Sequence, residues 1–77
     1  MSTLKLLPYR DLARVAEMAG FQWKRQRGSH NTFQADDGRT VTIPDHGHRV
    51  IVRPLLRKIL RDMGLTVDEY NDLVEKM

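Results

Sequence analysis

Residues 21–43 decide the fold; they read FQWKRQRGSHNTFQADDGRTVTI. Apolar and polar residues alternate with the period of a β-strand in three runs: 21–26, 31–35 and 40–43. Gly28 and Ser29 interrupt the alternation after the first run, and the Asp-Asp-Gly-Arg stretch at 36–39 interrupts it after the second. Gly38 can supply the positive φ that a tight turn needs. We therefore predict three antiparallel strands joined by two hairpin turns.

Within the first run, the alternation places Phe21, Trp23 and Arg25 on one face of the strand. Aromatic side chains in such a pattern serve either as core residues or as stacking platforms for bases. We favour the core for Phe21, Trp23 and Phe33, because the strands must turn one face toward the helices. The apolar residues of the third run should point toward the helices as well.

Apolar residues recur at helical spacing in three further segments: 8–19, 54–63 and the residues after 66. The first helix should start at Pro8. Backbone N–H groups in the first turn of a helix have no hydrogen-bond acceptor within the helix, so a proline, which lacks this N–H, is tolerated there. Gly20 and Gly64 should end the first and second helices in the left-handed conformation. Thr66 should cap the third, since Glu69 completes the T-x-x-E capping-box pattern.

The predicted order is α-β-β-β-α plus a short C-terminal helix. We expect an α+β fold like that of a double-stranded-RNA-binding domain, with the helices on one face of a three-stranded antiparallel sheet. The other face would be left to solvent or a ligand. Without repeats, low-complexity segments or linkers, residues 1–77 should form a single domain. The order of elements alone does not establish a function.

The 77 residues contain 13 Lys and Arg against 10 Asp and Glu, a formal charge of +3. Residues 21–61 hold nine basic and three acidic residues, a net of +6, whereas residues 62–77 hold one and five, a net of −4. Such a basic block favours nucleic acid or anionic lipid. The absence of cysteine excludes disulfide scaffolds and thiol catalysis. No apolar run approaches the ~20 residues of a membrane span, so we expect a soluble cytoplasmic protein with no membrane partner.

The strongest candidate for chemistry is His30, in the Gly-Ser-His stretch between the first two strands. Histidine exchanges protons near neutral pH, as a general acid or base must. Gly28 lets the backbone approach a phosphate, and Ser29 can donate a hydrogen bond to it. Three cations precede the stretch and would stabilise phosphate charge: Lys24, Arg25 and Arg27. The alternative is a turn histidine that bonds only the backbone, and the residues alone leave the two readings balanced.

The remaining titratable clusters do not suggest a metal site. His46 and His48 lie in a polar loop, and two imidazoles without a carboxylate partner bind metal poorly. Asp36 and Asp37 are interpreted as turn formers, because their side chains diverge at a turn. We expect no metal and no organic cofactor.

Three stretches stand in an ordered arrangement: Gly28-Ser29-His30-x-x-Phe33, Asp-Gly-Arg-x-Val-Thr-Ile-Pro-x-His at 37–46, and Leu-x-x-Ile-Leu-x-x-x-Gly-Leu-Thr at 56–66. Together they resemble the HicA family, the mRNA interferase toxins of HicA–HicB toxin–antitoxin modules. The resemblance covers most of the chain, from the first helix to the start of the third. The family usually has Gly-Thr-Leu at the start of the second helix, where this chain has Pro54-Leu55-Leu56.

This resemblance implies a double-stranded-RNA-binding-domain-like fold and metal-independent cleavage of mRNA, which inhibits translation and growth. It also implies that His30 is the catalytic residue and that a HicB-type antitoxin covers the site. His30 would act on a ribose 2′-hydroxyl or on water, with Ser29 and His46 as candidate assisting residues. The expected RNA-binding residues are Lys24, Arg25, Arg27, Gly28 and Arg39.

Two other classes of function explain the basic block. A non-catalytic RNA-binding module needs the cations but not the histidine, so the Gly-Ser-His stretch distinguishes it from a nuclease. A protein-interaction domain could instead present the basic face to an acidic partner.

Overall fold

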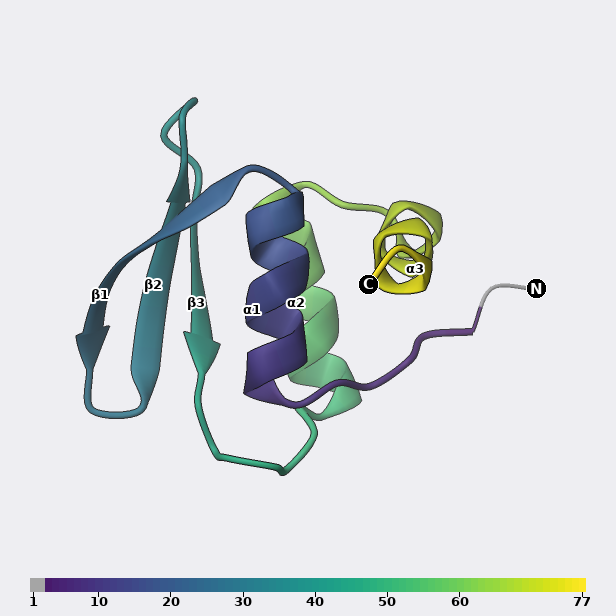
Figure 1. Cartoon of the computed structure of the whole chain (residues 1–77), viewed down its shortest axis with the longest axis horizontal. Helices are drawn as coiled ribbons and strands as arrows, with labels where there is room; N and C mark the ends of the chain where they lie inside the picture. Colours follow the sequence, from purple (N-terminus) through teal and green to yellow (C-terminus); the bar gives the residue numbers. More distant parts are fainter. Residues whose placement is uncertain (1–2) are drawn as a thin grey trace.

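The first two helices of this protein pack on one face of a three-stranded antiparallel sheet with the strand order β1-β2-β3, and the C-terminal helix packs against the first helix, away from the sheet (Figure 1). The structure is a computed structural model and describes residues 3–77. Its elements are α1 (Tyr9–Met18), β1 (Phe21–Arg27), β2 (His30–Ala35), β3 (Thr40–Pro44), α2 (Arg53–Met63) and α3 (Val67–Glu75). The α-β-β-β-α-α order confirms the predicted fold class, and it is consistent with a double-stranded-RNA-binding-domain-like fold.

The helix ends follow the local signals in the sequence, with one shift. Helix α1 begins at Tyr9, and Pro8 is its N-cap because its backbone is extended and pairs with Val50. Gly20 and Gly64 adopt φ values of +94° and +76°, so both act as the predicted left-handed stops. The capping box at the start of α3 is also confirmed.

The core lies between the sheet and the helices. Its fully buried side chains come from all six elements, and the largest are Tyr70, Phe21, Phe33, Leu12, Ile43, Leu56, Ile59 and Met63. Helix α3 joins the core through Tyr70, whose hydroxyl donates a hydrogen bond to the backbone carbonyl of Lys5 at 2.5 Å. Within residues 3–77 no helix has both the length and the apolar character needed to cross a lipid bilayer.

The first strand departs from simple alternation. Trp23 pairs with Phe33, whereas Arg25 pairs with Thr32, so Lys24 is an extra residue in a β-bulge. Arg25 therefore lies on the face of the sheet opposite to Trp23, and the expectation that they share a face is wrong. A pattern of alternate residues cannot reveal this bulge, because it depends on the register with the next strand.

Trp23 is not a core residue, although Phe21 and Phe33 are. Its side chain is 52% exposed, while Phe21 and Phe33 are 1% and 2% exposed. Because it pairs with Phe33, Trp23 lies on the helix side of the sheet. However, β1 is an edge strand, and every residue of β1 after Phe21 is exposed. The helices therefore cover only the start of this strand.

Candidate functional site

The Gly-Ser-His stretch forms the turn between β1 and β2 and the first residue of β2. Arg27 pairs directly with His30, which leaves Gly28 and Ser29 as a two-residue hairpin loop. Gly28 has φ +58°, and no other residue of this loop has a positive φ, as in a type II′ turn. A Cβ added at Gly28 would meet no atom within 4 Å, so the backbone conformation alone requires glycine here.

The turn brings cations next to the imidazole. Residues that pair directly across two antiparallel strands project on the same face, so Arg27 lies beside His30. The bulge places Arg25 on this outer face as well, opposite Thr32. Within residues 3–77, Lys24, Arg25 and Arg27 form no salt bridge, and all three are exposed with His30. The hairpin therefore presents unpaired positive charge around one exposed histidine.

A hydrogen-bonded network fixes the back of the turn. Asn31 is only 3% exposed; its Oδ1 accepts from Nε1 of Trp23 at 3.0 Å. The Nδ2 of Asn31 donates to the Ser29 carbonyl at 3.4 Å. The backbone N–H of Asp45 donates to the same carbonyl at 2.7 Å. Asn31 is not among the site residues predicted from the sequence. The signal that could have identified it is a polar residue two positions before Phe33, on the inward face of β2.

The network also places the loop after β3 beside the turn. Pro44 pairs with His30, and Asp45 is bonded to Ser29, so the backbone of His46 follows within one residue of this contact. His46 is exposed, and its carbonyl accepts from the N–H of Arg49. The loop thus brings the backbone next to His46 back to the Gly-Ser-His turn. In residues 3–77 no three His, Asp or Glu side chains converge as potential metal ligands.

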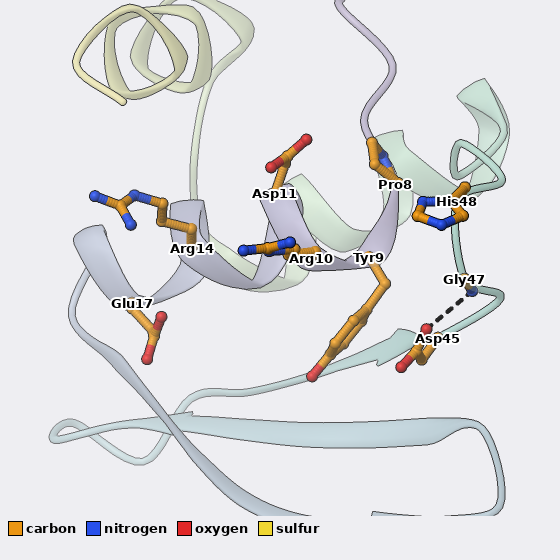
Figure 2. Close-up of a pocket in the computed structure, with 9 residues that line it drawn as sticks. All are labelled: Pro8, Tyr9, Arg10, Asp11, Arg14, Glu17, Asp45, Gly47 and His48. Atoms are coloured by element: carbon orange, nitrogen blue, oxygen red, sulfur yellow. Dashed lines mark hydrogen bonds between the residues drawn. The ribbon is translucent and has the colours of Figure 1, made fainter.

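A hollow of about 850 Å³ lies between α1 and this loop (Figure 2). Its lining residues are Pro8, Tyr9, Arg10, Asp11, Arg14, Glu17, Asp45, Gly47 and His48. Tyr9 points from α1 toward the sheet, and its ring lies 6.5 Å from that of Phe33. Burial, and then the nearby carboxylates of Asp45 and Glu17, raise the pKa of Tyr9. None of the predicted site residues lines this hollow, which adjoins the turn only through Asp45.

Arg39 does not join the other predicted RNA-binding residues. It follows the turn between β2 and β3, at the opposite end of β2 from His30 (Figure 1). Its guanidinium donates to a carboxylate oxygen of Asp37 at 2.8 Å and to the Met63 carbonyl at 2.5 Å, and it lies 5.3 Å from the centre of the Phe21 ring. The hydrogen bond from Arg39 also lowers the pKa of Asp37. These contacts indicate a structural role, in which Arg39 ties the turn to the C-terminal end of α2.

Comparison with known proteins identifies one family. The model of the family described as HicA toxin of bacterial toxin-antitoxin matches residues 9–65. The matched segment runs from the start of α1 to just beyond α2, and it includes the whole sheet and the Gly-Ser-His turn. No curated protein matches the chain.

Proposed function

This chain belongs to the HicA toxin family of bacterial toxin–antitoxin modules, and we propose that it acts as a metal-independent RNA endonuclease through His30. The observation that carries the proposal is the direct pairing of Arg27 with His30. It puts a guanidinium that forms no salt bridge within residues 3–77 beside an exposed imidazole. A phosphodiester held by Arg27 would thus lie within reach of a group that can transfer protons.

In the proposed reaction, His30 removes the proton from a ribose 2′-hydroxyl. The 2′-oxygen then attacks the adjacent phosphorus, and the bond from phosphorus to the 5′-oxygen of the next nucleotide breaks. The products are a 2′,3′-cyclic phosphate and a 5′-hydroxyl, and the leaving oxygen takes up a proton from a general acid. This route requires RNA, because DNA lacks the 2′-hydroxyl.

The cations and the turn have separate parts in this scheme. Lys24, Arg25 and Arg27 bind the phosphates around the cleaved bond and stabilise the additional negative charge in the transition state. We assign the general acid to His46, because the loop that carries it is bonded to Ser29. The Ser29 hydroxyl would orient the phosphate. Gly28 allows the tight turn that places Ser29 and His30.

A toxin of this family acts within a module that includes an antitoxin. We propose that the antitoxin is of the HicB type and that it blocks access to the His30 end of the sheet. The exposure of His30 and of its neighbouring cations supports this proposal, because a bound protein could cover all of them together.

The test compares His30→Ala with His48→Ala, a matched change of a second exposed histidine. Loss of a general base typically costs about 10²–10⁴-fold in rate, so His30→Ala should abolish RNA cleavage and relieve growth arrest on induction. His48→Ala should keep both activities, and the thermal unfolding of both variants should match that of the parent. Cleavage by the parent should persist in EDTA.

Full cleavage by His30→Ala would refute the catalytic assignment. If the parent protein bound RNA but did not cleave it, the non-catalytic RNA-binding module would be favoured instead. Loss of cleavage in EDTA with recovery in magnesium would show that a metal takes part.

A further inference from the structure

We propose that the indole of Trp23 is a stacking platform for an unpaired RNA base next to the Gly-Ser-His turn. This inference rests on the proposed function and adds to it a specific contact with the substrate. It assigns a binding role to a side chain that takes no part in the proton transfers described above.

The first observation is the exposure of the ring. At 52% exposed, Trp23 is the one aromatic residue among the exposed large hydrophobic side chains of residues 3–77. Its cross-strand partner Phe33 is buried, and the ring of Phe33 in turn contacts Tyr9. Trp23 thus extends the row of aromatic side chains beyond the area that the helices cover.

The second observation is that the exposed ring is held in place. Its Nε1 donates to Oδ1 of Asn31, and Asn31 donates to the carbonyl of Ser29. The orientation of the indole is therefore coupled to the turn that carries His30. A ring that is already ordered loses little conformational entropy on binding, which is why rigid aromatic side chains are effective contact residues.

The third observation is the charge around the ring. Trp23 and Arg25 lie on opposite faces of β1, with the bulge residue Lys24 between them. Among the described residues 3–77, no strand pairs with the outer edge of β1, so this edge is open to a ligand. A single strand of RNA that crosses the edge could place phosphates on Arg25 and Arg27 and a base on Trp23.

This combination favours nucleic acid over an acidic protein as the occupant. Single-stranded nucleic acid is typically bound by a basic surface that holds the backbone and by aromatic rings on which bases stack. Every base has a stackable face, so the contact would tolerate different sequences. An acidic protein would match the cations, and a tryptophan can also anchor a protein interface. In single-stranded RNA, however, every phosphate is linked to a base that can stack, so one ligand supplies both partners.

The experiment measures the binding of two end-labelled strands of equal length by fluorescence anisotropy. One is a single-stranded 2′-O-methyl RNA of mixed sequence, which the 2′-hydroxyl route cannot cleave; the other has the same backbone without bases. Trp23→Ala should weaken binding to the first strand about 5- to 150-fold, the range expected for one base–aromatic stack, and should leave binding to the second unchanged. Trp23→Phe, which keeps a ring, should retain most of the affinity.

Two further variants serve as controls. Trp23→Leu keeps apolar bulk without a ring and should behave like Trp23→Ala, which provides a second test if the alanine variant does not fold. Met18→Ala removes an exposed apolar side chain from α1 and should change neither affinity. Because Trp23 is the single tryptophan of the chain, base stacking should also quench the emission of the parent protein.

The outcomes separate the two proposals. Equal losses for both strands, or no loss for either, would overturn the stacking role; the second result is the one expected if the indole serves the antitoxin instead. Cleavage that survives His30→Ala would refute the catalytic assignment and leave the stacking result intact. Failure of the parent protein to bind either strand would overturn both proposals.

Discussion

At the scale of single residues, two buried polar side chains hold distant parts of the chain together. Asn31 links Trp23 to the backbone of the Gly-Ser-His turn, and Tyr70 links α3 to the N-terminal segment through Lys5. Within residues 3–77, no buried side-chain nitrogen or oxygen lacks a partner. A buried polar group of this kind that loses its hydrogen-bond partner lowers the free energy of unfolding by about 1–3 kcal/mol. The positions of Asn31 and Tyr70 should therefore both be sensitive to substitution.

Tyr70 should make stability depend on pH in the alkaline range. Burial raises the pKa of Tyr70 to about 12, whereas tyrosine in an unfolded chain titrates near pH 10. Between these values only the unfolded chain releases the proton, so the stability that is fully present below about pH 10 should fall by up to about 1.4 kcal/mol per pH unit. Urea unfolding followed by circular dichroism between pH 8 and about 11.5 measures this slope.

Tyr70→Phe should remove the contribution of Tyr70 to the fall in stability above about pH 10. It should also lower stability at pH 8 by about 1 kcal/mol, because the hydrogen bond to the Lys5 carbonyl is lost. Tyr9→Phe is the matched control. The pKa of Tyr9 is also raised, but removing the Tyr9 hydroxyl leaves the contribution of Tyr70 in place. An alkaline slope that is the same in Tyr70→Phe and in the parent would contradict this account.

At the scale of elements, the hairpin of β1 and β2 determines which side chains surround His30. The type II′ turn aligns Arg27 with His30, and the bulge at Lys24 then places Arg25 on the same face while Trp23 stays on the other. Bulges often reorient side chains next to functional sites. If β1 kept Lys24 but had no bulge, Lys24 would pair with Thr32, and Arg25 would point to the helix side of the sheet.

Deletion of Lys24 should therefore be tolerated. Without the extra residue, Trp23 and Arg25 become neighbours in a regular strand, where they still project on opposite faces. We expect a cooperative thermal transition by circular dichroism and a change in stability within about 1 kcal/mol, since the affected side chain is exposed.

Deletion of Thr32 is the control, because β2 has no bulge to absorb it. It would turn either Asn31 or Phe33 outward, and we expect no cooperative transition. If the Lys24 deletion lost its cooperative transition as the Thr32 deletion does, Lys24 would not be the dispensable bulge residue that the register indicates.

At the scale of the whole molecule, the two hairpin turns lie at opposite ends of the sheet and have different partners (Figure 1). The turn at Gly28 carries cations that form no salt bridge within residues 3–77. The turn at Arg39 is attached to the end of α2, and a Cβ at Gly64 would come within 2.6 Å of the Arg39 guanidinium. The cations of the two turns thus differ: those at the Gly28 turn are available for the proposed binding of RNA, whereas Arg39 ties its turn to α2.

Arg27→Ala and Arg39→Ala should therefore affect different properties: the first RNA binding, the second stability. Arg27→Ala should weaken binding of single-stranded RNA and reduce the slope of log K against log salt by about 0.7, the value for one lost phosphate contact, without changing stability. Arg39→Ala should lower stability by about 1–2 kcal/mol, because it leaves the Met63 carbonyl without its charged donor, and should leave the salt slope unchanged. Salt titrations of RNA binding and thermal unfolding measure the two quantities; a reduced salt slope in Arg39→Ala would return that residue to the binding surface.

Local signals in the sequence were sufficient for the element types, the fold class, the position of the Gly-Ser-His turn and the helix ends, apart from the shift of one residue at Pro8. These features depend on neighbours a few residues apart: the period of the apolar residues, the cap at Thr66 and the glycines that accept positive φ. The catalytic role of His30 remains a prediction, and RNA cleavage by the His30→Ala variant tests it.

The exposure of Trp23, the face occupied by Arg25 and the attachment of Arg39 to α2 were decided by the tertiary structure. Each depends on residues outside its own segment: the helices, which cover only the start of β1, the register with β2, and the carbonyl of Met63. A period of two or of 3.6 residues says which side chains share a face, but it cannot say how much of that face another element covers. For this reason the sequence by itself located the candidate site, and only the packed structure showed which side chains it brings to His30.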